Sequence, residues 1–194
     1  MGTPYQLDRT LEFAKQKFAE LDPKLMAQNA GAILLQNQII LPYFNDMVKV
    51  NWPDADFFQE LSLQEKILVL HYLTTAIDLP PLGKWVGFSE LKDGLLYLEP
   101  FRKRTTNLLV KVYGKEPEKL AQKAKALGAK FSDKGDVSFQ LKILPKIELF
   151  IVFWAEDEEF AANANILFDA RARLYLEIED LVQLASIVVL KLIK

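Results

Sequence analysis

The sequence predicts an α+β protein in which helices pack on an antiparallel sheet, within a single domain over residues 1–194. Three observations lead to this prediction. Apolar residues recur at helical spacing in some segments and form short alternating or continuous runs in others. The strand-like runs follow one another through short turns, which is typical of antiparallel pairing. A length of 194 residues without a low-complexity linker favours one domain over two.

The composition is that of a protein with a packed core. Hydrophobic residues make up 51% of the chain, and 24 basic residues nearly balance 26 acidic ones, for a net charge of -2. Nucleic-acid binding needs a basic surface, so we expect no nucleic-acid partner. The chain has no cysteine, which excludes disulfides, thiol nucleophiles and cysteine-ligated zinc or iron–sulfur clusters within it.

The sequence predicts a cytoplasmic protein with no membrane partner. The apolar tract near the C-terminus, Ile187–Leu190, is interrupted by Lys191 and is far too short to span a bilayer. Residues Met1–Tyr5 lack the basic and then apolar pattern of a signal peptide.

Residues 1–30 are predicted to form an N-terminal helical segment. Apolar residues at helical spacing indicate an amphipathic helix from about Tyr5 to Glu20. Asp22 then serves as the N-cap of a second helix, with Pro23 at its first position and Gly31 as its stop.

A small antiparallel meander is expected next. Its strands are Ile33–Leu35, Gln38–Phe44 and Met47–Val50, with turns at Gln36-Asn37 and Asn45-Asp46.

Ser62 and Glu65 have the spacing of a capping box, which predicts a helix that ends before Pro80. Lys92-Asp93-Gly94 is a predicted turn between short strands. One helix is expected from Pro100 to near Gly114.

Another helix is expected from Pro117 to Gly128. Val137–Ile143 and Ile147–Trp154 are predicted strands, and Ile166–Phe168 a third. A helix is expected over residues 174–194, although its β-branched end leaves a strand as the alternative.

An acidic run directly after a buried strand is the strongest candidate site. The strand Leu149–Trp154 leads into Glu156–Glu159. Adjacent carboxylates need counter-charge, a metal or full solvation. Either the run is a solvated cap on the strand, or alternate acids point one way and bind a cation or a basic partner. The candidate residues are Trp154, Asp157, Glu158, Glu159 and Phe160.

Two further residues are candidates. His71 is the only histidine and lies on the capped helix, either as a hydrogen-bonded boundary residue or as a ligand or base. Arg102 and its basic neighbours are predicted to start a helix, where positive charge opposes the helix dipole. Either they lie on an exposed face, or they bind a phosphate or carboxylate group, or they pair with the acidic run. If Leu149–Trp154 and Ile166–Phe168 pair as a hairpin, Asp169 lies at the far end from the acidic run, as a turn or cap residue.

Several short motifs in order resemble a known family. They are Leu70–Leu73, Gly83–Leu91, Ala155–Phe160, Ile166–Asp169, Tyr175-Leu176 and Glu179–Leu181. Together they resemble the family filed as domain of unknown function 3786, seen mostly in anaerobic bacteria and archaea. The resemblance implies an accessory role in anaerobic one-carbon, corrinoid or iron–sulfur metabolism, with an iron–sulfur or corrinoid protein as partner. It implies no catalytic residues, and any cluster would belong to the partner because this chain has no cysteine.

The leading hypothesis is a non-catalytic accessory or binding protein that presents the acidic run to a ligand or partner. The first alternative is an enzyme that uses Asp157 and Glu159 around a hard cation, with His71 as base. The second is a structural homodimer formed through the apolar face of the last helix. The sequence identifies no cofactor, metal or substrate.

Overall fold

The structure is a computed structural model that describes residues 4–194, so residues 1–3 of the predicted N-terminal segment lie outside the described residues. Contacts divide the chain into two compact units. The N-terminal unit contains the chain up to Pro80 together with Leu144–Lys146 and Leu174–Leu176. The C-terminal unit contains Pro81–Ile143, Ile147–Arg173 and Glu177–Lys194.

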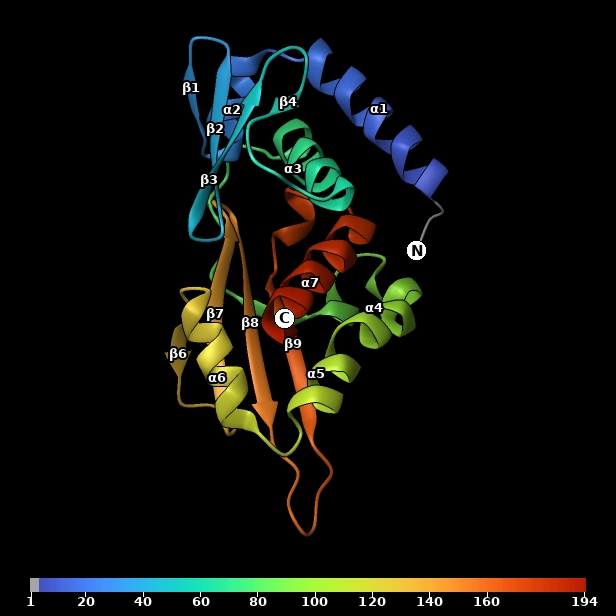
Figure 1. The fold of residues 1–194 in the computed structure, drawn as a ribbon, viewed down its shortest axis with the longest axis vertical. Coiled ribbons are helices and arrows are strands. Elements are labelled where there is room, and N and C mark those ends of the chain that lie inside the picture. Colours follow the sequence, from blue (N-terminus) through green and yellow to red (C-terminus); the bar gives the residue numbers. More distant parts are fainter. Residues whose placement is uncertain (1–3) are drawn as a thin grey trace. The chain divides into compact units, whose positions relative to one another are not determined.

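Helices of the N-terminal unit begin at or within one residue of the predicted starts, but the third ends at Thr75, earlier than the predicted stop before Pro80. They are α1 (Pro4–Glu20), α2 (Pro23–Ala30) and α3 (Leu63–Thr75) (Figure 1). The Asp22 carboxylate accepts hydrogen bonds from the first free N–H groups of α2, and Gly31 ends that helix in the left-handed conformation, with φ of 69°. The predicted capping box of α3 is also present.

The predicted meander is confirmed as a four-stranded antiparallel sheet. Its strands are β1 (Ile33–Leu35), β2 (Gln38–Tyr43), β3 (Asp46–Asn51) and β4 (Asp56–Phe57), hydrogen-bonded in that order. Alternate residues of β2 are buried, so one face of the sheet contributes to the core. β4 was not predicted, because two residues are too few to show a strand pattern.

A second sheet lies in the C-terminal unit, with strand order β5-β9-β8-β7-β6. These strands are β5 (Trp85–Gly87), β6 (Lys130–Ser132), β7 (Val137–Leu144), β8 (Ile147–Trp154) and β9 (Asn163–Asp169). From Leu149 to Phe153 every residue of β8 is buried, as expected of a central strand with both faces covered.

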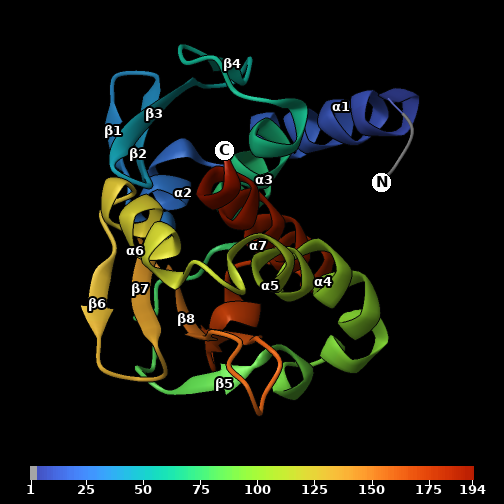
Figure 2. The same ribbon diagram turned by 60° about the horizontal axis from the view of Figure 1, so that its bottom comes forward.

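Four helices complete the C-terminal unit: α4 (Leu98–Arg104), α5 (Thr106–Tyr113), α6 (Pro117–Ala126) and α7 (Ile178–Ile193). Helices α4, α5 and α6 each pack against α7 (Figure 2). The apolar residues of α7 are mostly buried, so its helical stripe supplies much of the core. Short 3-10 turns lie at η1 (Phe88–Glu90), η2 (Gly94–Tyr97) and η3 (Ala172–Leu174).

The structure corrects three of the predicted elements. The helix expected from Pro100 to Gly114 is two helices, because Thr105 leaves the helical conformation with φ of -131° and ψ of -91°. The segment after the turn at Asp93 is the 3-10 turn η2 and not a strand. The C-terminal helix begins at Ile178 and not at residue 174.

Both sheets pair antiparallel wherever their register is defined, and helices flank them, so the predicted α+β class is confirmed. Within residues 4–194, no helix combines the length and the apolar character needed to cross a membrane.

Candidate functional site

The acidic residues lie in the connection between β8 and β9. Trp154 pairs with Asn163 as the last pair of the hairpin, so residues 155–162 form the connecting segment, here called the acidic loop. In Figure 1 the acidic loop extends beyond the ends of both strands. The hairpin predicted from the sequence is therefore confirmed.

Asp169 lies at the opposite end of this hairpin, as predicted. It is 5% exposed, and its carboxylate accepts hydrogen bonds from the N–H groups of Leu82, Gly83 and Arg171 at 2.6–3.0 Å. This carboxylate thus holds two chain segments together as a turn residue, away from the acidic loop.

Hydrogen bonds of Asp157 fix the shape of the acidic loop. Its Oδ1 accepts from the N–H groups of Glu159 at 2.8 Å and Phe160 at 2.7 Å. Its own N–H donates to the Phe160 carbonyl at 3.0 Å. A short polar side chain that bonds the backbone two and three residues ahead makes a defined turn. The acidic loop is therefore a shaped turn, with one carboxylate oxygen of Asp157 already engaged.

Glu156 attaches the acidic loop to the end of α5. Its N–H donates to the Gly114 carbonyl at 2.9 Å, and its carboxylate lies 3.3 Å from the Lys115 ammonium. A cavity of about 320 Å³ lies between Glu156 and the C-terminal turn of α5. Both ends of the ion pair are exposed, so it contributes little to stability.

The remaining acids and the flanking aromatic residues face solvent. Glu158 and Glu159 are exposed, and neither has an ion-pair partner within the described residues. Trp154 is 38% exposed and Phe160 is 69% exposed. The acidic loop, together with the adjoining Trp154, therefore presents two carboxylates and two aromatic side chains to an incoming molecule.

A groove of about 570 Å³ begins where the acidic loop ends. One wall is formed by five consecutive residues of β9, Asn163–Leu167, and the end of β5 with η1 contributes Gly87–Glu90. The other wall comes from α4 and α5, through Leu98, Phe101, Arg102, Thr106 and Asn107. Its volume is that of an ordinary ligand site, about 300–1,000 Å³.

Stacked aromatic rings form the base of the groove. Phe88 and Phe101 lie 4.1 Å apart between ring centres and are parallel to within 3°. Both rings also contact the ring of Phe168 at 5.8–5.9 Å. All three side chains are at most 3% exposed, so the groove has a packed apolar base beneath polar walls.

Arg102 lines this groove, but its expected helix position was wrong. It lies with Lys103 and Arg104 in the last turn of α4, not at a helix start. Positive charge in a last turn is favourable for the helix dipole, so no other interaction is needed to explain these residues. Apolar residues keep their helical spacing across the break at Thr105, whose hydroxyl donates to the Phe101 carbonyl at 2.6 Å, so the spacing alone predicts one longer helix. Arg102 is half-exposed and lies 3.7 Å from Glu99.

His71 lies on α3 in the N-terminal unit, whereas Arg102 and the acidic loop belong to the C-terminal unit. It is half-buried, and its carbonyl accepts hydrogen bonds from the hydroxyls of Thr74 and Thr75. Its proposed role as a base stays a prediction.

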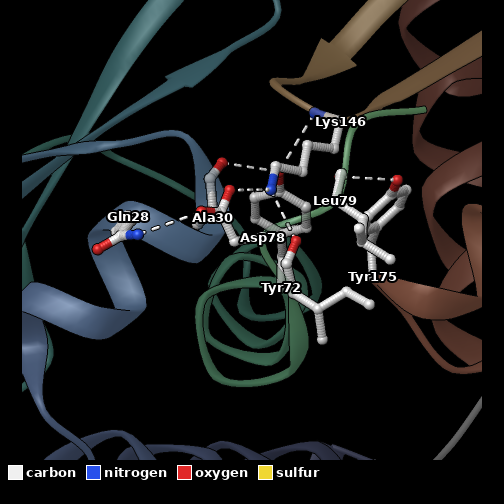
Figure 3. Close-up of polar contacts among 8 residues, drawn as sticks. Gln28, Ala30, Tyr72, Asp78, Leu79, Lys146 and Tyr175 are labelled. Carbon is white, nitrogen blue, oxygen red and sulfur yellow. Dashed lines mark hydrogen bonds and ion pairs between the residues drawn. The ribbon is translucent and has the colours of Figure 1, made fainter.

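A buried lysine of the N-terminal unit was not foreseen from the sequence (Figure 3). The Lys146 ammonium donates to the Ile77 carbonyl at 2.6 Å and lies 3.5 Å from the Asp78 carboxylate. The other Asp78 oxygen accepts from the Gln28 amide at 3.1 Å. The hydrogen bond from Gln28, followed by the charge of Lys146, lowers the pKa of Asp78.

Tyr72 joins the same cluster from α3. Its hydroxyl donates to the Ala30 carbonyl at 2.8 Å and accepts from the Lys146 N–H at 3.2 Å (Figure 3). Burial raises the pKa of Tyr72, so the hydroxyl stays neutral and acts as a donor. The hydroxyl caps the last carbonyl of α2, which would otherwise be an unpaired helix end, and the cluster is structural. Only the turn around Pro145 was visible in the sequence, and a turn predicts exposure.

Within residues 4–194, no three histidine or acidic side chains are placed to hold a metal ion. Fold and site together define an α+β protein with a hydrogen-bonded acidic loop beside a groove. The chain belongs to the family described as Domain of unknown function (DUF3786), whose model matches residues 22–191. This match confirms the resemblance drawn from the ordered motifs. Neither a curated protein nor a solved structure matches the chain.

Proposed function

We propose that this protein is a cytoplasmic, non-catalytic accessory protein that binds a partner or ligand with the acidic loop and the adjoining groove. One observation carries the proposal. The loop is shaped by hydrogen bonds of Asp157, exposes Glu158 and Glu159, and runs directly into a groove of about 570 Å³.

The chemistry of this surface favours a partner that carries positive charge. Exposed carboxylates attract and orient basic groups, and this raises the rate of association more than the affinity. Trp154 and Phe160 add aromatic surface, which is enriched in the parts of interfaces that dominate affinity. An iron–sulfur or corrinoid protein of anaerobic metabolism is the partner that the family resemblance supports.

Partner capture tests the proposal. The triple variant D157N/E158Q/E159Q removes three negative charges but keeps the shape of the loop, because an asparagine oxygen at position 157 accepts the same two N–H groups. A matched control, D54N/E60Q/E118Q, removes three exposed acids elsewhere. Proteins captured by the immobilised full chain are identified by mass spectrometry. We expect the wild type and the control to retain the same partners and the loop variant to lose them. Equal recovery by all three proteins would contradict the proposal.

Both alternatives stay predictions. For the metal-dependent enzyme, thermal unfolding with added Mg²⁺ or Ca²⁺ is the check, since a bound cation raises the melting temperature. For the homodimer, light scattering gives the mass directly. The apolar residues of α7 on which the homodimer was based are buried within the chain.

A further inference from the structure

We propose that the groove receives an extended segment of a partner protein, which pairs with the free edge of β9 as an added strand. This inference rests on the proposed function and specifies the partner's conformation and charge.

The edge of β9 is only partly covered. β9 lies between β8 and β5 in the sheet, and β8 pairs with it from Asn163 to Phe168. On the other side β5 pairs only with the last three residues, ending at Gly87 opposite Leu167. The chain then leaves the sheet as η1. Within the described residues, the segment Asn163–Ile166 therefore has no strand on that side, over roughly 13 Å.

Backbone groups of β9 point toward this open side. The N–H of Ala170 donates to the Lys84 carbonyl at 2.8 Å, which continues the β5–β9 pairing. Backbone bonding groups alternate between the two neighbours of a strand, so Ile166 and Ala164 direct theirs to the same side as Ala170. The N–H of Ala164 bonds locally to the side-chain oxygen of Asn163 at 2.8 Å, so an added strand replaces this bond.

The lining of the groove agrees with an open edge. Side chains alternate along a strand, so a cavity over one face contacts every second residue. Here five consecutive residues, Asn163–Leu167, line the groove, as expected when the backbone edge itself forms the wall. An exposed edge with pairable backbone groups is the surface to which extended peptides add.

The acidic loop determines the charge of the occupant. A segment that continues the row of β5 runs antiparallel to β9, as β5 does, so its C-terminal end reaches Asn163. Asn163 directly follows the acidic loop, where Glu158 and Glu159 are exposed. The occupant we propose is an extended segment of a partner protein with lysine or arginine at its C-terminal end.

Two labelled peptides test the inference by fluorescence polarisation with the full chain. Val-Thr-Val-Thr-Val-Lys-Lys places its charge toward the acidic loop, and Lys-Lys-Val-Thr-Val-Thr-Val places the same charge at the other end. We expect the first to bind about fivefold more tightly, from two exposed ion pairs. This preference should vanish in D157N/E158Q/E159Q and at high salt, and remain in D54N/E60Q/E118Q.

Backbone pairing is tested on the tighter peptide by N-methylation. Methylating every second amide on the edge that faces β9 should abolish binding, whereas methylating the intervening amides should leave it, because a strand pairs through alternate residues. Hydrogen exchange at Ile166 should slow in the complex. Equal effects of the two methylation patterns, or no saturable binding up to about 1 mM, would overturn the inference.

The two proposals fail separately. Loop-dependent partner capture without peptide binding would leave the proposed function standing and remove the added strand. Peptide binding with the expected charge preference supports the added strand, even where captured proteins do not depend on the loop.

Discussion

Removal of the Tyr72 hydroxyl, as in Y72F, should destabilise the protein strongly although only one oxygen atom is lost. The side chain is fully buried, and its hydroxyl both donates to the Ala30 carbonyl and accepts from the Lys146 N–H. Phenylalanine keeps the ring and leaves both backbone groups without this partner. An unsatisfied buried polar group costs about 1–3 kcal/mol, so with two such groups Y72F should lower the free energy of unfolding by about 2–6 kcal/mol.

Tyr175 provides a matched control in the same unit. Its hydroxyl donates to the Leu79 carbonyl at 3.1 Å, and Leu79 is an exposed residue. Y175F should therefore cost at most about 1 kcal/mol. Urea unfolding followed by circular dichroism and fluorescence measures both variants, with agreement of the two probes required before a two-state analysis. A Y72F protein within about 0.5 kcal/mol of the wild type, or an equal loss in Y175F, would refute the role assigned to the hydroxyl.

Two further predictions concern charge and helix capping. The hydrogen bond from Gln28 and the charge of Lys146 lower the pKa of Asp78, so the unfolded chain takes up this proton more readily than the folded one. Asp78 therefore contributes to the free energy of unfolding above the ordinary aspartate pKa, and this contribution is lost as the pH falls through its lowered pKa. D78N should flatten the dependence of the urea midpoint on pH between about pH 2 and 5. An unchanged slope would argue against this linkage. Ser62→Ala removes the hydroxyl that accepts from the Glu65 N–H, and should cost about 0.5–2 kcal/mol of unfolding free energy. Ser62→Gly should cost only a few tenths by the same measurement, and an equal loss in both variants would exclude capping as the cause.

Local signals in the sequence predicted most of the elements. Asp22, Pro23 and Gly31 set both ends of α2, and Ser62 with Glu65 set the start of α3, because capping depends on residues within one helical turn. The β8–β9 hairpin followed from a continuous apolar run and a turn.

Features that depend on distant residues were not predicted. The groove lies between β9 and segments from Gly87 to Asn107. The hydrophobic periodicity of the sequence does not predict which strand edge is left uncovered. The partners of Lys146 lie about 70 residues earlier in the chain, so a turn signature could not reveal its burial. The helix breaks at Thr105 although the apolar residues keep their helical spacing through this point. The break is accompanied by a single hydrogen bond from the Thr105 side chain to its own helix.

Photo-crosslinking at Phe160 tests the central claim most directly. Phe160 and Phe58 are both exposed, at 69% and 57%, but only Phe160 belongs to the acidic loop. A benzophenone amino acid is placed at one position or the other in the full chain, which is then irradiated with the captured partners. The account predicts a covalent adduct with the partner from position 160 and none from position 58. Adducts of equal yield from both positions, or from position 58 alone, would contradict it.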